Sequence, residues 1–236
     1  MILRQVLPEQ KDIDCDGLAG LRNVLQLVPV RRGVTMLNLV FDEQGHTTGK
    51  SGSSRDISNE LDYQSLMALR NQADYIVTSA KTARVEKYRR SRMAPLVLLS
   101  ESGNFDGIPA VVEAAAGPQE SPVFLVSQHH DLGDIAARYP QTWVRVIDYT
   151  QMVEKFASAN FVVAETGLSL SKKLIASGLI QEIALSVVGV RADVKQVLNR
   201  ALHSLGLGNP DPYYLASVQD TVFARFRDLK HHATQY

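Results

Sequence analysis

The sequence has 236 residues, of which 45% are hydrophobic and 21% are charged. This composition supplies enough apolar side chains for a packed core and excludes an intrinsically disordered chain. Lysine and arginine together number 25, as do aspartate and glutamate, and this zero net charge argues against a protein that coats nucleic acid. The single cysteine, Cys15, excludes an internal disulfide framework and a cysteine-rich zinc site.

The same features predict where the protein works and what it does not bind. No apolar run approaches the ~20 residues that span a bilayer, and residues 1–11 lack the apolar stretch of a secretory signal peptide. We therefore expect a cytoplasmic protein with neither a membrane nor a nucleic acid as partner. Adjacent histidines occur at 129–130 and 231–232, but neighbours on a helix diverge by about 100 degrees and rarely share a metal, so we expect no metal site.

Residues 1–32 are predicted to be an N-terminal appendage that packs on the core. Apolar residues recur at spacings of three and four between Leu18 and Val28, and three aspartates precede them, as is typical of the start of an amphipathic helix. Pro29 is expected to end this helix. No chemistry is evident in this part of the chain.

From Gly33 onwards, strand-forming runs alternate with helical patterns. The run 34–41 is almost continuously apolar, which favours a strand buried on both faces. Residues 42–59 form a long stretch rich in glycine, serine and charge, typical of a functional or mobile loop, and Ser58 is expected to cap the helix that follows. Further strands are predicted at 75–77, 96–99, 123–126, 143–147, 161–164 and 183–190, with helices at 82–92 (fraying into a basic loop), 132–138, 150–157 and 169–177.

This alternation predicts an α/β fold with a mostly parallel mixed sheet and helices on both faces. Two further runs, 213–218 and 222–226, are separated by a polar break and predict an antiparallel pair at the C-terminal edge of the sheet. No repeat or linker divides the chain after the appendage. We therefore expect residues 33–236 to form a single domain.

Ligands of open parallel sheets bind beyond the carboxyl ends of the strands, and the first candidate segment there is 75–82. Hydroxyl and backbone N–H groups at a helix start can hold an anion, and Lys81 would add charge. The alternative is that Ser79 or Thr82 simply caps the helix.

Another candidate is 162–170, in which Glu165 follows a strand. Gly167 and hydroxyl residues then open a helix, an arrangement that suits the approach of a phosphate. The alternative is a solvated acid followed by a helix cap. Two further candidates are the serine turn at 98–103 and the loop segment 51–56, and each of the four segments is a weak signal by itself.

A basic run extends from Lys81 to Arg92, with six cations against one acid, Glu86. It could hold the phosphates of a cofactor and a substrate, because arginine binds phosphate in a bidentate manner. It could also be an RNA-binding patch or a solvated turn, and the zero net charge of the chain disfavours RNA.

In their order along the chain, these segments resemble the dihydrofolate-reductase-like family, and more closely the reductase domain of riboflavin biosynthesis. Residues 73–82 are similar to the family's cofactor segment, and Glu86 stands at the position of its acid. Residues 165–170 are similar to the family's E-G-G-P-x-L turn. Residues 51–58 are similar to its S-G…W-I-S loop, with Asp56 at the tryptophan position. The resemblance runs from about Gly33 to Arg227 and does not include the zinc-binding deaminase part of bifunctional relatives.

The resemblance implies a dihydrofolate-reductase-like fold and an NADPH-dependent reductase, working as a homodimer. Hydride would pass to C1′ of the ring-opened ribosyl group of 5-amino-6-(5-phosphoribosylamino)uracil, a small phosphorylated substrate. Glu165 would be catalytic and would contact the substrate together with Ser54. One of three arginines would hold the substrate phosphate: Arg89, Arg90 or Arg92. The residues implied to contact the cofactor are Asp56, Ser79, Lys81, Thr82, Glu86, Ser100, Gly167, Leu168, Ser169 and Leu170.

The sequence departs from the family pattern at positions that bear on the substrate. Gln44 replaces an aspartate, Asp56 replaces the loop tryptophan, and Thr166 replaces the first glycine of the turn. Two alternatives therefore stay open. One is a related reductase acting on a pteridine, a folate or another small carbonyl or imine, and the other is a non-catalytic protein that binds NADPH.

Overall fold

The computed structural model describes residues 1–113, 121–128 and 131–229, so both histidine pairs lie outside the described residues. The chain divides into two compact units. The terminal unit contains Met1–Pro29, Met36–Leu69 and Leu168–Tyr236, and the central unit contains Val30–Thr35 and Arg70–Gly167. Among the described residues, no helix is both long enough and apolar enough to cross a membrane.

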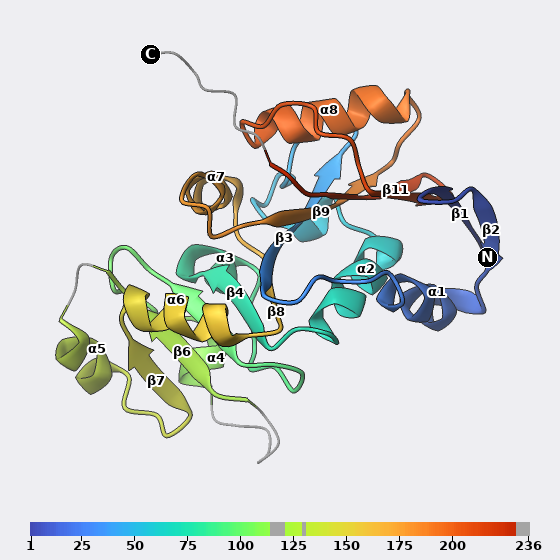
Figure 1. Ribbon diagram of the computed structural model, residues 1–236. Coiled ribbons are helices and arrows are strands. Elements are labelled where there is room, and N and C mark those ends of the chain that lie inside the picture. The colour runs from blue at the N-terminus through green and yellow to red at the C-terminus, as the bar shows by residue number, and fades with distance from the viewer. Residues whose placement is uncertain (114–120, 129–130, 230–236) are drawn as a thin grey trace, which may run out of the picture. The chain divides into compact units, whose positions relative to one another are not determined.

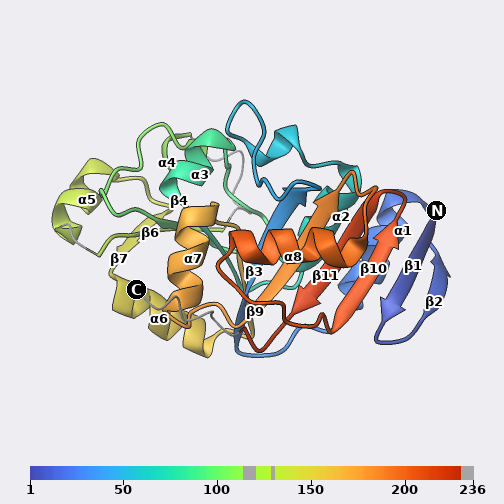
Figure 2. The same ribbon diagram turned by 90° about the horizontal axis from the view of Figure 1, so that it is seen from above.

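The terminal unit has a mixed sheet whose strands pair in the order β2-β1-β10-β11-β9-β3 (Figures 1 and 2). In this order, β9 and β3 are parallel to each other, and every other neighbouring pair is antiparallel. The predicted antiparallel pair of residues 213–218 and 222–226 is therefore confirmed, but it does not form the edge of the sheet, because β1 and β2 lie beyond β10. The strands are β1 (Ile2–Leu7), β2 (Lys11–Asp14), β3 (Val34–Asp42), β9 (Glu182–Val188), β10 (Tyr214–Val218) and β11 (Thr221–Phe226).

Strand β3 shows why this sheet forms. Its residues from Val34 to Phe41 are all buried, as the continuous apolar run predicts for a strand covered on both faces. It pairs in parallel with β9 from Met36 opposite Glu182 to Asp42 opposite Val188.

Helices cover both faces of the terminal sheet (Figure 1). Helices α1 (Gly17–Gln26) and α2 (Glu60–Arg70) lie on one face, and α7 (Leu168–Ala176) and α8 (Val194–Ser204) lie on the other. One core cluster joins α1, α2 and the sheet, and it includes Leu3, Leu21, Leu61 and Phe223. The N-terminal segment thus contributes side chains to this core, while the boundary at residue 32 stays a prediction.

Three elements of this unit go beyond the sequence expectations. Strand β1 alternates over only six residues and β2 is almost wholly exposed, so both are held mainly by backbone pairing that leaves little apolar pattern. Helix α8 is different, because its signals are readable in the sequence: Asp193 caps its start, and Val197, Leu198, Ala201 and Leu202 form a buried stripe.

The predicted cap of α2 is wrong by one residue, since the Asn59 Oδ1 atom, and not Ser58, accepts the backbone N–H of Asp62 at 2.9 Å.

The central unit has a parallel sheet in the order β8-β4-β5-β6-β7. Along the chain, the strands β4, β5, β6 and β7 are added in turn on one side of β4, and β8 is then added on its other side. Because parallel crossovers are right-handed, the helix that precedes β8, α6, lies on the face of the sheet opposite α3 and α4, as Figure 2 shows. The predicted α/β fold, mostly parallel with helices on both faces, is confirmed. The strands are β4 (Tyr75–Ser79), β5 (Leu96–Leu99), β6 (Val123–Val126), β7 (Val144–Ile147) and β8 (Phe161–Ala164), and the helices are α3 (Ala80–Val85), α4 (Pro109–Val112), α5 (Leu132–Arg138) and α6 (Tyr149–Ser158).

Candidate functional site

Three of the predicted segments meet at one edge of the central sheet. Strand β4 lies between β5 and β8, with Ser79 opposite Leu99 and Val77 opposite Ala164. Because all three strands are parallel, their carboxyl ends lie at the same edge, which is where ligands of such sheets bind. The residues that follow the three strands, and so share this edge, are Ser79 to Thr82, Ser100 to Ser102 and Glu165 to Gly167.

The first turn of α3 follows β4 directly. The Ser79 hydroxyl accepts the backbone N–H of Thr82 at 2.9 Å and donates to the Thr82 hydroxyl at 2.9 Å. Ser79 is therefore a helix cap, as one of the two sequence interpretations holds. Lys81 is exposed and Thr82 is partly exposed at the same turn, so a cation and a hydroxyl remain on the surface there.

The turn after β8 approaches this helix closely. A Cβ atom placed on Gly167 would lie 3.5 Å from the Thr82 hydroxyl, and Gly167 itself is exposed. Thr82 and Gly167, two residues implied to contact the cofactor, are thus neighbours although 85 positions separate them in the sequence. Leu168, Ser169 and Leu170 follow Gly167 directly and form the first turn of α7, in the terminal unit.

The loop after β5 is tied to the same helix. The Ser100 N–H donates to the Val126 carbonyl at 3.0 Å, and Arg84 of α3 donates to the Asp106 carbonyl at 2.8 Å and the Asn104 carbonyl at 3.2 Å. These bonds fix the position of Ser100 relative to α3. Ser100 is partly exposed, so its hydroxyl can reach a ligand at this edge.

Glu165 is buried, with 7% of its surface exposed, and its carboxylate is held by two side chains. Arg70 donates from Nε to Oε1 at 2.7 Å and from Nη2 to Oε2 at 2.5 Å, and the Tyr88 hydroxyl donates to Oε2 at 2.5 Å. The guanidinium of Arg70 also lies 5.3 Å from the centre of the Tyr88 ring. This cluster of Arg70, Tyr88 and Glu165 has no signature in the sequence, because its members are spread over 95 positions.

Burial and charge together shift the pKa values of Arg70 and Tyr88. Desolvation alone would lower the pKa of Arg70, but the adjacent Glu165 carboxylate outweighs it and raises that pKa. Desolvation, reinforced by the negative charge of Glu165, raises the pKa of Tyr88 well above 10.0. Arg70 is therefore charged and Tyr88 is neutral at physiological pH, which matches a hydroxyl that donates to a carboxylate.

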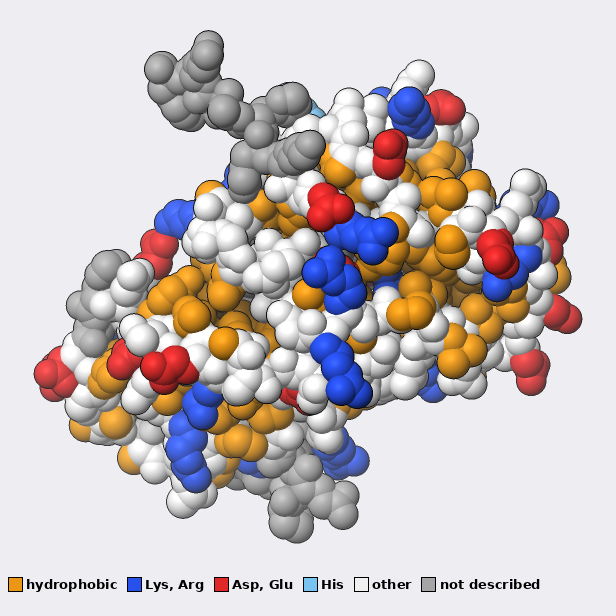
Figure 3. Space-filling model, in the orientation of Figure 1, with side chains coloured by type: hydrophobic (Ala, Val, Ile, Leu, Met, Phe, Trp, Pro, Cys, Tyr) orange, Lys and Arg blue, Asp and Glu red, His pale blue; other side chains and the backbone are white. Residues whose placement is uncertain are grey.

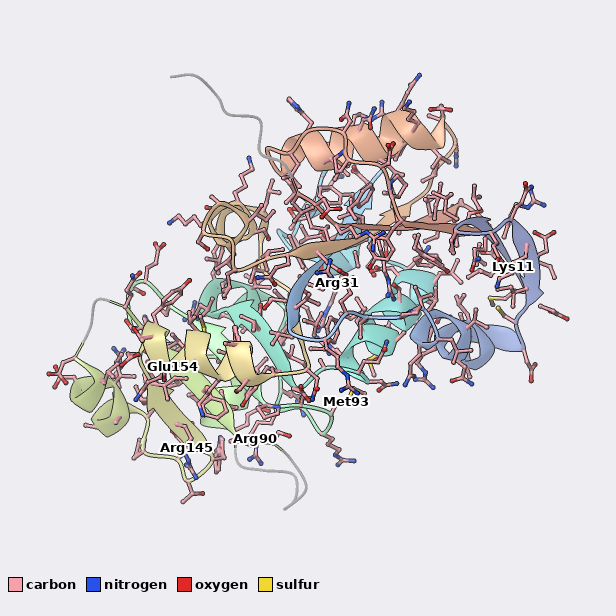
Figure 4. All side chains as sticks on the ribbon, in the orientation of Figure 1. Lys11, Arg31, Arg90, Met93, Arg145 and Glu154 are labelled. Atoms are coloured by element: carbon pink, nitrogen blue, oxygen red, sulfur yellow. The ribbon has the colours of Figure 1, made fainter. Side chains whose placement is uncertain are left out.

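The arginines expected to hold a substrate phosphate lie elsewhere. Arg90 stacks on Trp143, 4.6 Å from the ring centre, and Trp143 immediately precedes β7 (Arg90 is labelled in Figure 4). The neighbouring Ser91 carbonyl accepts the N–H of Ser121, which precedes β6. Arg90 thus lies at the amino ends of the strands, the edge opposite Thr82 and Gly167.

The other basic residues of this run are on the surface. Arg89 is exposed and pairs with Glu113 at 3.7 Å, and Arg92 is exposed. Glu86, which follows α3, is instead buried. Figure 3 shows that acidic and basic side chains both occur on the face drawn there.

The long loop of the terminal unit contains a short 3₁₀ helix, Ser54–Asp56. The Asp56 carboxylate accepts the N–H of Ser51 at 2.7 Å, a bond that lowers the pKa of Asp56. A Cβ atom on Gly49 would collide with the Asp56 side chain, so this turn requires glycine. Asp56 therefore holds the loop together and Ser54 lies partly buried within it, while their contacts with cofactor and substrate stay predictions.

An open depression of about 520 Å³ lies between α5 and β7. Its lining includes Leu132, Tyr139, Pro140 and Val144, and among the described residues that line it none is a predicted site residue. The candidate site is thus the edge formed by β4, β5 and β8 and not this depression.

Residues 44–190, more than half of the chain, match the family model of the RibD C-terminal domain. The chain belongs to the RibD C-terminal domain family. The resemblance to the reductase domain of riboflavin biosynthesis is thereby confirmed, and family membership supports a reductase. No curated protein sequence matches the chain.

Solved structures with the same fold include three relatives of this family. A pyrimidine reductase-like protein from Corynebacterium diphtheriae is 17% identical with a TM-score of 0.66, over 89% of this chain and 99% of that one. The riboflavin biosynthesis reductase Rib7 of Saccharomyces cerevisiae is 12% identical with a TM-score of 0.56, over 90% and 97% of the two chains. RibD of Acinetobacter baumannii is 14% identical with a TM-score of 0.58, over 85% of this chain and only 59% of that chain.

Proposed function

We propose that this protein is an NADPH-dependent reductase of riboflavin biosynthesis that acts on 5-amino-6-(5-phosphoribosylamino)uracil in the cytoplasm, as a homodimer. The observation that carries the proposal is the meeting of Thr82, Ser100 and Gly167 at the carboxyl edge of one parallel sheet. Family membership and the names of the relatives in riboflavin synthesis and pyrimidine reduction support the same reading.

The residues at this edge fit a dinucleotide phosphate. Gly167 has no side chain to block a close approach, Thr82 supplies a hydroxyl, and Lys81 supplies an exposed positive charge. In the next turn, Leu168, Ser169 and Leu170 carry backbone N–H groups at the start of α7, where the first four have no partner within the helix. These residues would bind the cofactor, with Ser79 and Glu86 supporting α3.

The protein's own part in the reaction is to bind, orient and exclude water. NADPH, when bound, supplies the hydride. Lys81, Thr82 and Gly167 would hold its phosphates, and Ser100 would contact it from the β5 end. Ser54 would contact the substrate, and Asp56 would keep the loop that carries Ser54 in place.

Two observations favour a second candidate, a reductase of the same family with another substrate or a non-catalytic NADPH-binding protein. The Glu165 carboxylate is already bound by Arg70 and Tyr88. Arg90 lies at the opposite edge of the sheet from the proposed cofactor residues. Both features weaken the match to the family's substrate site more than the match to its cofactor site.

The decisive experiment measures NADPH oxidation with 5-amino-6-(5-phosphoribosylamino)uracil and with dihydrofolate in parallel, with substrate-free controls. Turnover of the uracil compound alone supports the proposed function. Turnover of dihydrofolate alone, or NADPH binding by calorimetry without turnover of either compound, supports the second candidate. Parallel titrations with NADH test the cofactor preference, for which a charged contact to the 2′-phosphate predicts about tenfold or greater discrimination.

A further inference from the structure

We infer that Arg70 and Tyr88 are positioning residues, which act through Glu165 to hold the turn after β8 against Thr82 and so keep the cofactor site formed. This inference rests on the proposed function, because it concerns the NADPH-binding residues Thr82 and Gly167. It assigns Glu165 to positioning and not to direct contact with the substrate.

The side chain of Glu165 has little capacity left for a substrate. Arg70 occupies both carboxylate oxygens, and Tyr88 adds a second donor to Oε2. The carboxylate is buried, while Arg70 and Tyr88 are partly buried. A substrate that took its place would have to leave the Arg70 guanidinium without its buried counter-ion, which is strongly unfavourable.

The main chain of Glu165 transmits this hold to the site. Its N–H donates to the Val77 carbonyl at 2.7 Å, and its own carbonyl accepts the Thr78 hydroxyl at 2.6 Å. Gly167, which faces the Thr82 hydroxyl, is only two residues further along the chain. Fixing both the backbone and the side chain of Glu165 therefore fixes where Gly167 can lie.

Tyr88 connects the cluster to the opposite side of the same approach. It follows α3, and its N–H donates to the Ala83 carbonyl at 2.9 Å, one residue after Thr82. The hydroxyl bond from Tyr88 to Glu165 thus links the end of α3 to the end of β8. These are the two segments that bring Thr82 and Gly167 together.

The test is NADPH affinity, measured by calorimetry without substrate, for Tyr88→Phe and Glu165→Gln. Tyr88→Phe removes one hydroxyl and keeps the ring, while Glu165→Gln keeps the shape and removes the charge. Trp143→Phe is the matched control, because it removes an aromatic N–H that donates to the Ala110 carbonyl at the other edge of the central sheet. Melting temperatures are measured for all four proteins, and binding is measured well below the lowest of them.

We expect Tyr88→Phe and Glu165→Gln to weaken NADPH binding by about ten- to a hundredfold, the loss typical of a hydrogen bond to a charged group. Trp143→Phe should leave NADPH affinity within about twofold even if it lowers the melting temperature equally. Unchanged NADPH affinity in both cluster variants would overturn the inference, as would an equal loss in the control.

Kinetics separate this inference from a catalytic Glu165. A positioning role predicts that Tyr88→Phe raises the KM for NADPH and leaves kcat at saturating NADPH nearly unchanged. A fall in kcat with NADPH affinity intact would assign Glu165 to the substrate and overturn the inference. If Glu165→Gln does not fold, Tyr88→Phe decides alone. Absence of NADPH binding by the wild-type protein would instead refute the proposed function, and the inference with it.

Discussion

Replacing Arg225 with alanine should destabilise the protein more than any exposed arginine does. Arg225 lies in β11 and is only 5% exposed. Its guanidinium donates to the Leu25 carbonyl in the last turn of α1 at 3.4 Å. It also donates to the carbonyls of Val28 at 3.1 Å and Pro29 at 3.4 Å, which lie just beyond α1. Burial lowers the pKa of Arg225, against the opposing effects of Tyr213, Tyr214 and Glu182.

The expected loss follows from these contacts. Removing one member of a buried charged network costs about 3–5 kcal/mol, because the remaining polar groups stay buried without their partner. Here those groups are the carbonyls at the end of α1, and the buried Glu182 carboxylate would also lose a nearby positive charge while keeping its hydrogen bond from Tyr213. For a chain of this length each kcal/mol lowers the melting temperature by about 2–4 °C, so we expect a fall of about 6–20 °C.

Urea denaturation followed by circular dichroism measures the free energy of unfolding. Arg227→Ala is the matched control, since Arg227 lies two residues further on, is exposed and only stacks over the Tyr213 ring at 5.2 Å. It should lose less than about 1 kcal/mol. Arg225→Met separates the lost charge from the lost packing, because methionine fills most of the space of the arginine stem. Equal losses in Arg225→Ala and Arg227→Ala would refute the reasoning.

Three further predictions concern the site and the pH dependence. Gly167→Val places a branched side chain beside Thr82 and should weaken NADPH binding about tenfold or more; an unchanged dissociation constant by calorimetry would contradict this close approach. Burial raises the pKa of Tyr213 and of Tyr214 from 10.0 to about 12. The folded state thus holds these protons more tightly than the unfolded state, so the stability that the two tyrosines contribute is complete below pH 10 and lost as the pH rises towards 12. The free energy of unfolding, measured by urea denaturation at several pH values in this range, should therefore fall less steeply for the variant with both tyrosines replaced by phenylalanine than for the wild type. Arg90→Ala should lower stability by about 1 kcal/mol through lost stacking on Trp143 and leave the substrate KM within about twofold; a large rise in that KM would restore Arg90 as the phosphate ligand.

Much of the fold could be read from local patterns. Strands such as 96–99, 123–126 and 161–164 lie where their short apolar runs predict, because a strand buried on both faces has few polar residues. The sequence analysis did not predict helix α8, although its Asp193 cap and its apolar period are local signals of the same kind. Strand β2 has no such signal, since a sequence of charged residues forms a strand only when a neighbouring backbone supplies the hydrogen bonds.

The site divides in the same way. The order of strand ends, hydroxyls and glycines along the chain was enough to indicate the family, which the family model confirms. It also predicted that Thr82 and Gly167 both contact the cofactor at one edge of the sheet, and the structure places these two residues side by side. The sequence could not assign a partner to Glu165, because Arg70 is 95 positions away and the ion pair exists only after the sheet has formed. Nor could it place Arg90, whose position depends on where Trp143 lies when the chain folds.

The sequence by itself therefore determined most of the strands and helices and the edge of the sheet where we propose that a cofactor binds, since these follow from local periodicity and from the direction of parallel strands, and the order of its motifs indicated the family. Only the tertiary structure decided what each charged side chain does there. Charge pairing depends on distance in space and on burial. The sequence alone therefore gives Glu165 no partner, whereas in the fold Glu165 is the buried counter-ion of Arg70.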